Sequence, residues 1–254
     1  MYQIIQYIKF LIKSTNQHGV HSPFVYNLVT KCFYNKNDYP EYNQIKEYRK
    51  SLLKNKRVLE ITDLGSGSRK TKTNKRHISE IAKTSGSSIK RAKLLFRLTK
   101  YFQPETIIEL GTSLGIATQA MSLGNPKSKI TSIEGCPNIS AFSKEKLNPY
   151  NNINIINDDF SNHLSKLNLN KYDFVFFDGN HQKEATLHYF KTLLPKAHNN
   201  TVFIFDDIYW SKDMKEAWEI IKQHPKVTVT INTFHWGFVF FRKEQAKEHF
   251  TIRV

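Results

Sequence analysis

Short apolar runs alternate with amphipathic segments along the chain from residue 106 onward. The apolar runs predict buried strands over Thr106–Leu110, Lys129–Glu134, Ile153–Asn157, Phe174–Asp178 and Val202–Asp206. The amphipathic segments predict helices over Ile116–Leu123, Ile139–Leu147, Phe160–Leu167, Lys183–Leu194 and Lys212–Gln223. Two final apolar runs, Val227–Thr233 and Phe238–Arg242, predict a closing hairpin. The pattern predicts an α/β protein with a doubly wound, seven-stranded sheet whose last strand is antiparallel.

The first part of the chain, residues 1–53, has apolar and aromatic positions at nearly helical spacing, which predicts an N-terminal helical extension. The run Met1–Lys13 is too short and too interrupted by lysines to be a membrane span or a signal peptide, so a helix and no transmembrane span are expected. The alternative is that this helix docks on a membrane surface. The segment His18–Phe24 contains two histidines and a Ser-Pro pair. It is either a turn that starts a helix or a pair of histidines that contacts a ligand.

The chain is strongly basic, with a formal net charge of +16 over 254 residues. Thirteen lysines and arginines face only three acids between residues 54 and 99. This charge favours anionic partners, nucleic acid included, although basic runs are often just solvated surface. Residues 54–89 are predicted to form a basic linker with a Gly- and Ser-rich loop near Leu64–Asn74. Helices over Ile78–Lys83 and Ile89–Tyr101 then lead into the first strand.

The stretch Ile107–Ala120 carries the clearest chemical signal, because an apolar strand runs into two glycines, Gly111 and Gly115, and then into a helix. Such a turn lets a ligand approach the main chain, and the N–H groups at the helix start favour polar or anionic atoms. A second strand ends about 20 residues later at Glu134, where an acid typically binds ribose hydroxyls. The unit is therefore predicted to bind a nucleoside. The alternative is a βαβ unit without a ligand.

The similar-looking Asp63-Leu-Gly65-Ser-Gly67 is rejected as a nucleotide-binding turn, because a polar basic run and no amphipathic helix follows it.

This arrangement resembles the class I S-adenosylmethionine-dependent methyltransferases, whose fold is Rossmann-like, and the resemblance places the methyltransferase domain over residues 90–254. Within that superfamily it is most similar to the catechol and caffeoyl-coenzyme A O-methyltransferases and their bacterial relatives. The resemblance implies S-adenosylmethionine as cofactor. It implies a set of cofactor-binding residues: Glu109, Gly111, Thr112, Ser113, Gly115, Glu134, Asp158, Asp159 and Asp178. Of the two acids after the third strand, Asp159 is expected to meet the adenine amine.

Two further motifs carry the resemblance to O-methyltransferases, the run from Tyr172 to His181 and the run Phe203–Ile208. In the metal-dependent relatives, the corresponding acids hold a divalent cation, which implies Asp178, Asp206 and Asp207 as ligands for Mg²⁺ or another divalent ion. Such carboxylates end neighbouring strands, where open α/β sheets bind ligands, and hard oxygen ligands suit these ions.

Two departures put metal dependence in doubt: His181 replaces the family's lysine base, and Asp207 replaces its asparagine. The catalytic residues are predicted to be His181 and Asp178, with His181 as base; His181 is alternatively a metal ligand or a packing residue. Tyr209 and Trp210 are expected either to wall the acceptor site or to pack in the core. An alternative for Asp206 and Asp207 is a cap for the following helix.

The predicted function is methyl transfer from S-adenosylmethionine to a hydroxyl, on a small molecule or on a tRNA nucleoside. The alternatives are a non-catalytic RNA-binding protein on a degenerate methyltransferase fold and a dinucleotide-dependent oxidoreductase, which expects a Gly-x-Gly-x-x-Gly turn. The two cysteines form no disulfide framework, which favours a reducing, cytoplasmic compartment. The N-terminal helices are candidates for covering the acceptor site or for a homodimer contact.

Overall fold

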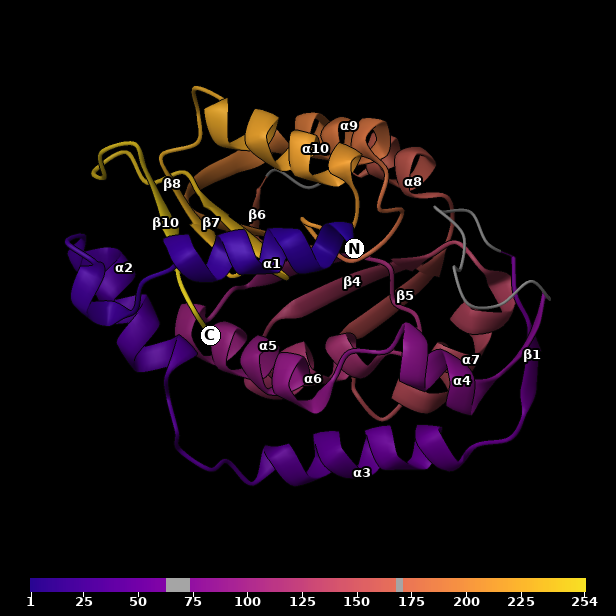
Figure 1. The fold of residues 1–254 in the computed structure, drawn as a ribbon. Coiled ribbons are helices and arrows are strands. Elements are labelled where there is room, and N and C mark those ends of the chain that lie inside the picture. The colour runs from indigo at the N-terminus through magenta and orange to yellow at the C-terminus, as the bar shows by residue number, and fades with distance from the viewer. Residues whose placement is uncertain (63–73, 168–170) are drawn as a thin grey trace. The chain divides into compact units, whose positions relative to one another are not determined.

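The computed structural model describes residues 1–62, 74–167 and 171–254 (Figure 1). The chain forms two compact units: Asn35–His163, and Met1–Tyr34 together with Leu164–Val254. The glycine- and serine-rich loop predicted near Leu64–Asn74, and the rejected glycine motif that begins at Asp63, lie almost entirely outside the described residues.

The unit Asn35–His163 is built on three parallel strands in the order β3-β4-β5. Their bounds are β3 Thr106–Leu110, β4 Lys129–Glu134 and β5 Ile153–Asn157, as predicted from the apolar runs. Helix α6 (Ile116–Gly124) connects β3 to β4, and helix α7 (Pro137–Leu147) connects β4 to β5. Such crossovers allow the strands to run parallel, so their carboxyl ends meet at one edge.

Among the described residues, this part of the chain also contains four more helices, the last of which runs on into the second unit, and a short ribbon. They are α3 Glu41–Lys54, α4 Ile78–Thr84, α5 Ile89–Phe102, α8 Phe160–Lys166, and the antiparallel strands β1 Val58–Glu60 and β2 Lys75–His77. Helix α5 packs closely on α6 because the last residue of α6 is Gly124. A Cβ at this position would collide with the Thr99 hydroxyl and the Phe96 carbonyl oxygen of α5.

The described part of the second unit contains five strands in the order β10-β8-β9-β7-β6. Their bounds are β6 Tyr172–Phe177, β7 Ala197–Phe205, β8 Val229–Asn232, β9 Gly237–Phe240 and β10 Glu248–Thr251. Strands β6 and β7 are parallel, and β9 runs antiparallel to both β7 and β8. Helices α9 (Lys183–Leu193) and α10 (Lys212–Gln223) lie side by side over this unit's strands (Figure 1).

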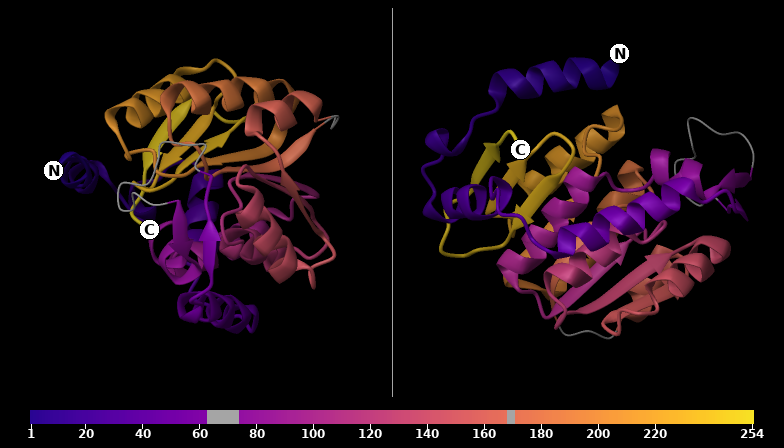
Figure 2. Two further views of the ribbon diagram at one scale, coloured as in Figure 1. Left: turned by 90° about the vertical axis from the view of Figure 1, so that its right-hand side faces the viewer. Right: turned by 90° about the horizontal axis from the view of Figure 1, so that it is seen from below.

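The N-terminal segment belongs to the second unit and is tied to its last strand. It comprises α1 Tyr2–Lys13, a 3₁₀ turn Gln17–Gly19, α2 Pro23–Leu28 and a π turn Val29–Phe33. Thr15 forms a parallel bridge with Ile252, and the Tyr34 hydroxyl donates to the carbonyl of Arg253. The Ser22 side chain accepts from the N–H of Val25, so the Ser-Pro pair starts α2 as the turn interpretation predicts. Helix α1 lies on the outside of its unit (Figure 2).

The α/β class, the mostly parallel strands and the antiparallel strand near the C-terminus agree with the sequence prediction. Among the described residues, strands β3 to β10 number eight where seven were predicted, because β10 pairs in parallel with β8. Its sequence, Glu-His-Phe-Thr, is short and polar, and only Phe250 is buried. Among the described helices, none is long and apolar enough to cross a membrane.

Candidate active site

The turn after β3 has the backbone conformation that its glycines suggested. Gly111 has a φ of 102°, Ser113 of 47° and Gly115 of 77°, all in or beyond the left-handed region that glycine tolerates best. The N–H of Gly111 donates to the carbonyl of Ile133 at 2.9 Å, so the turn leaves β3 beside the end of β4. At Gly115 an added Cβ would also lie 2.6 Å from Leu147 Cδ1. The turn therefore requires glycine at position 115 for both conformation and space.

Glu134 lies against this turn, as predicted. One carboxylate oxygen accepts from the N–H of Ser113 at 2.9 Å, and the other accepts from the N–H of Cys136 at 2.9 Å. Burial raises the pKa of Glu134, and the backbone N–H groups oppose that rise. Each carboxylate oxygen can accept a second hydrogen bond. The side chain is thus held in place with acceptor capacity for hydroxyl groups.

Glu109 takes a different position from Glu134. It is fully buried, and one oxygen accepts from the hydroxyls of Thr118 and Ser132 at 2.5 and 2.6 Å. The other oxygen has no hydrogen-bond partner among the described residues. Burial raises the pKa of Glu109 to about 7, against the lowering effect of the two hydroxyls. The hydroxyl of Thr112 pairs with that of Ser132, so a buried network connects the turn to β3, β4 and α6.

The two acids after β5 differ in their surroundings. Asp159 is exposed and accepts from the N–H of Asn162, so it caps the start of α8. Asp158 is half-buried and accepts from the Asn162 side-chain amide at 2.7 Å, with His163 Nδ1 3.7 Å from its other oxygen. The assignment of Asp159 to the adenine amine stays a prediction, and its observed contact is that of a helix cap.

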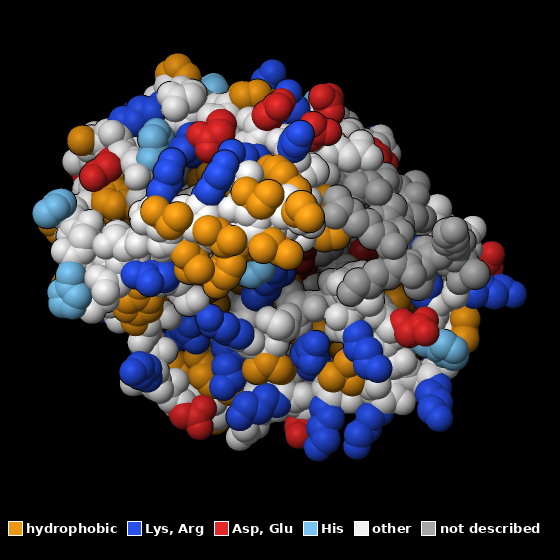
Figure 3. Space-filling view, in the orientation of Figure 1, with side chains coloured by type: hydrophobic (Ala, Val, Ile, Leu, Met, Phe, Trp, Pro, Cys, Tyr) orange, Lys and Arg blue, Asp and Glu red, His pale blue; other side chains and the backbone are white. Residues whose placement is uncertain are grey.

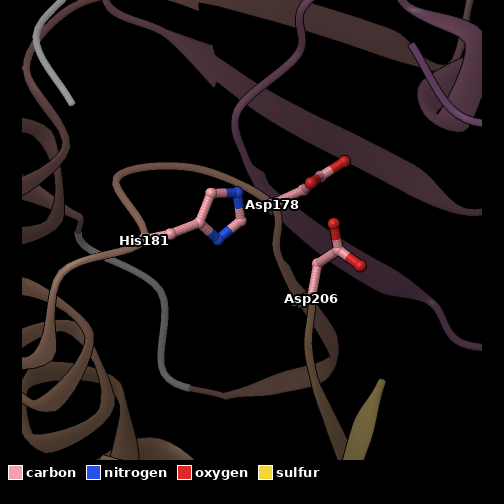
Figure 4. A group of neighbouring side chains, drawn as sticks. All are labelled: Asp178, His181 and Asp206. Carbon is pink, nitrogen blue, oxygen red and sulfur yellow. The ribbon is translucent and has the colours of Figure 1, made fainter. Parts of the chain in front are cut away.

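In the second unit, the structure brings together Asp178, His181 and Asp206 (Figure 4). Strands β6 and β7 pair with Phe177 opposite Phe205, and the N–H of Asp206 donates to the carbonyl of Phe177 at 2.9 Å. Because each acid follows its strand by one residue, the two carboxylates end up side by side. The imidazole of His181 approaches them from the loop after β6. One ligand atom from each residue lies within 4.8 Å of the other two.

The described group does not include Asp207, the third metal ligand implied by the resemblance. Its backbone has a φ of 51°, and its carbonyl accepts from the N–H of Trp210 at 2.8 Å. Asparagine and aspartate are the non-glycine residues that adopt this conformation most readily, which accounts for either residue at this position. The alternative that Asp206 and Asp207 cap the next helix is wrong, because Ser211 caps α10 by accepting from Met214.

The aromatic residues after the acid pair separate into two environments. The ring of Trp210 lies 6.3 Å from the ring of His181. Tyr209 instead stacks on Phe234 in the β8–β9 turn, with ring centroids 5.2 Å apart, and accepts a hydrogen bond from Asn232. Burial raises the pKa of Tyr209 and keeps it a neutral phenol. Sequence reasoning missed Phe234, because nothing in a turn between two short strands marks it as a contact.

Comparison with known proteins finds methyltransferases. A family model described as a methyltransferase domain matches residues 108–208. A search of curated proteins finds no match.

Solved structures with a similar fold include three methyltransferases. The S-adenosylhomocysteine-bound methyltransferase PaMTH1 from Podospora anserina has a TM-score of 0.63 at 15% identity, covering 88% of this chain and 97% of that one. The O-methyltransferase TomG from Streptomyces achromogenes, in complex with S-adenosylmethionine, has a TM-score of 0.55 at 17% identity, covering 63% and 82%. An O-methyltransferase from Bacillus cereus has a TM-score of 0.55 at 14% identity, covering 83% and 95%. Residues 108–208 therefore match a methyltransferase domain, and the fold is similar to that of methyltransferases solved with S-adenosylmethionine or S-adenosylhomocysteine, in agreement with the resemblance seen in the sequence.

Proposed function

We propose that this protein transfers the methyl group of S-adenosylmethionine to a hydroxyl of a small molecule, with His181 as the general base. The observation that carries the proposal is the grouping of His181 with two carboxylates at the ends of paired strands β6 and β7. Carboxyl ends of parallel strands are where α/β sheets bind ligands. The match to a methyltransferase domain indicates methyl transfer as the reaction class. The side chains of this group would accept the proton of the acceptor hydroxyl or bind a cation that activates it.

The turn of residues 111–115 and Glu134 are the proposed nucleoside site. The carboxylate of Glu134, fixed by two backbone N–H groups, would accept hydrogen bonds from the two ribose hydroxyls. Asp158 or Asp159 would receive the adenine amine. Glu109 and Thr112 would act indirectly, by shaping the turn. Both side chains hydrogen-bond to the hydroxyl of Ser132 in the core.

The acceptor step requires little beyond position and a proton acceptor. Methyl transfer is an in-line displacement, so holding the acceptor oxygen behind the methyl carbon supplies much of the rate. The oxygen forms its bond to the methyl carbon as the carbon–sulfur bond breaks and the sulfonium becomes a neutral thioether. The hydroxyl proton passes to the free imidazole nitrogen of His181.

The same three side chains fit a divalent cation, which is the second way of activating the acceptor. Two carboxylates and an imidazole with atoms within 4.8 Å of one another form a suitable donor set. The imidazole would favour Mn²⁺ or Zn²⁺ more than an all-oxygen site would. A bound cation would lower the pKa of a coordinated hydroxyl. Asp178 and Asp206 would hold it, with His181 as either third ligand or base.

The experiment measures S-adenosylhomocysteine formation and product mass with a panel of phenols and catechols. The expected result is a product heavier by one methyl group in place of a hydrogen, formed one for one with S-adenosylhomocysteine. His181→Asn should reduce kcat by about 100-fold or more, whereas His188→Asn, at an exposed site on α9, should leave it unchanged. Chelation followed by addition of Mg²⁺ or Mn²⁺ tests the cation separately. Full activity of His181→Asn, with or without metal, contradicts the assigned role.

A tRNA nucleoside is the second acceptor class that the sequence predicts. The observation in its favour is α5, which carries five lysines and arginines and no acid. RNA binding through such a surface should weaken steeply with added salt, since binding releases counterions from the phosphates. A binding titration with bulk tRNA at two salt concentrations checks this, and a flat salt response removes RNA as the acceptor.

A further inference from the structure

Helix α1 packs on its unit with its less apolar side. Gln6 and Phe10 are its buried residues. The ring of Phe10 lies 5.6 Å from that of Phe234, and the ring of Tyr7 lies 4.8 Å from it. Thr15, just after the helix, is bonded through its backbone to Thr251 and Arg253. The orientation of α1 about its own axis is therefore set by contacts on one side.

The opposite side of α1 is an exposed apolar stripe. Ile4, Ile8 and Ile12 recur every four residues and are 65%, 53% and 80% exposed. Met1, Ile5 and Leu11 extend the same surface and are also exposed. Figure 3 shows hydrophobic side chains gathered over this helix. An amphipathic helix normally turns such a stripe toward the core, and a contiguous patch of this kind on a surface marks a binding site.

Charge distinguishes between the possible occupants of this stripe. The helix contains no acid and has two lysines, Lys9 and Lys13. On a helical projection Lys9 borders the stripe, where a long side chain can reach past apolar residues to a negative group. The whole chain carries +16, so a second copy would bring a second acid-free helix and a large like charge to the contact. A surface with an apolar interior under a layer of negative groups complements both the isoleucine stripe and the positive charge of the helix.

We propose that α1 docks this protein on anionic lipid bilayers, lying flat in the interface. A helix of 12 residues is about 18 Å long at about 1.5 Å per residue, too short to cross a bilayer. Amphipathic helices of this type insert their apolar face about 5–10 Å into the boundary between headgroups and acyl chains. Ile4, Ile8 and Ile12 enter that boundary, and Lys9 contacts the phosphates.

The test is co-sedimentation of the full chain with vesicles of phosphatidylcholine and phosphatidylglycerol in equal amounts, compared with phosphatidylcholine alone. The protein should bind the anionic vesicles more tightly and lose binding as salt is raised. Ile8→Gln should weaken binding about tenfold, because it removes one buried apolar side chain, and the variant with Gln at positions 4, 8 and 12 should not bind. Ile220→Gln, which changes an isoleucine 47% exposed on α10, is the matched control and should bind like the unmodified protein.

Circular dichroism shows whether each variant is folded, and titration of S-adenosylhomocysteine keeps a failure of the cofactor site separate from a failure of docking. Equal binding of Ile8→Gln and the unmodified chain overturns the proposal, as does the absence of binding to anionic vesicles. Sedimentation velocity tests whether a second copy of this chain binds the stripe instead. A dimer that dissociates when the three isoleucines are replaced, without vesicle binding, assigns the stripe to a second copy of this chain.

Discussion

The buried carboxyl of Glu109 makes the stability of the protein depend on pH in a way that one substitution removes. Glu109 is fully buried, and its pKa in the folded protein is about 7 against an ordinary value of 4.5. Because the folded state binds this proton more tightly than the unfolded state, the contribution of Glu109 to stability is greatest at low pH. It falls as the pH rises from about 4.5 to about 7, and it is constant above that.

The size of this effect follows from the two pKa values. At about 1.4 kcal/mol for each pH unit, the difference corresponds to about 3 kcal/mol, and most of it is lost between about pH 4.5 and pH 7. Glu109→Gln keeps the size of the side chain and its acceptor for Thr118 and Ser132, but it cannot ionise. Its amide nitrogen takes the position of an oxygen that has no partner in the described structure, which costs about 1–3 kcal/mol at every pH.

The assay is urea unfolding of the unmodified protein and of Glu109→Gln across this pH range. The variant should be the less stable protein near pH 5 and should gain about 2–3 kcal/mol on the unmodified protein by pH 8. Glu105→Gln, at an exposed position just before β3, controls for the removal of a carboxyl as such. A difference between Glu109→Gln and the unmodified protein that stays constant with pH refutes the reasoning.

Three other substitutions test separate parts of the structure. Gly115→Ala should destabilise the protein by about 2 kcal/mol in urea unfolding, because residue 115 has a φ of 77° and the added methyl group would meet Leu147. An unchanged free energy of unfolding would contradict this. Phe234→Ala should cost about 2 kcal/mol and expose α1 to proteolysis, since its ring contacts Tyr7, Phe10 and Tyr209; resistance of α1 equal to that of the unmodified protein would contradict this. Asp206→Asn should lower kcat about 100-fold and leave cofactor affinity within about twofold, and a loss confined to cofactor binding would move Asp206 out of the acceptor site.

The strands and helices around the site could be predicted because their local signals agree with their burial. Lys129–Glu134 is an apolar run that ends in an acid, and it forms β4 with those bounds. The contact between Glu134 and the turn at residues 111–115 could be predicted because neighbouring parallel strands end at the same edge of the sheet. The strands missed by the sequence prediction, β1, β2 and β10, are three or four residues long and mostly exposed. They form because a neighbouring strand is available, and no periodicity in their own residues reveals this.

The limits of prediction in the site are similar. The sequence brings Asp178 and Asp206 together by strand register, and the structure agrees. The sequence alone does not determine whether His181 or Asp207 joins these two carboxylates, because that depends on the conformation of the loops. A left-handed residue at Asn180 shapes the loop before His181, and another at Asp207 shapes the chain after Asp206. Glu109 lies next to the end of one apolar strand and Glu134 ends another, and only the structure separates the buried acid from the one at the turn.

The most direct test of the account is calorimetric titration with S-adenosylhomocysteine, the product form of the cofactor, which binds without turnover. The unmodified protein should bind one molecule per chain, and Glu134→Gln should bind at least about tenfold more weakly, through the loss of charged acceptors for the ribose. Glu145→Gln, at an exposed site on α7, should bind like the unmodified protein. Absence of binding to the unmodified protein, or equal binding by Glu134→Gln, would contradict the proposal that Glu134 and the turn at residues 111–115 hold the cofactor.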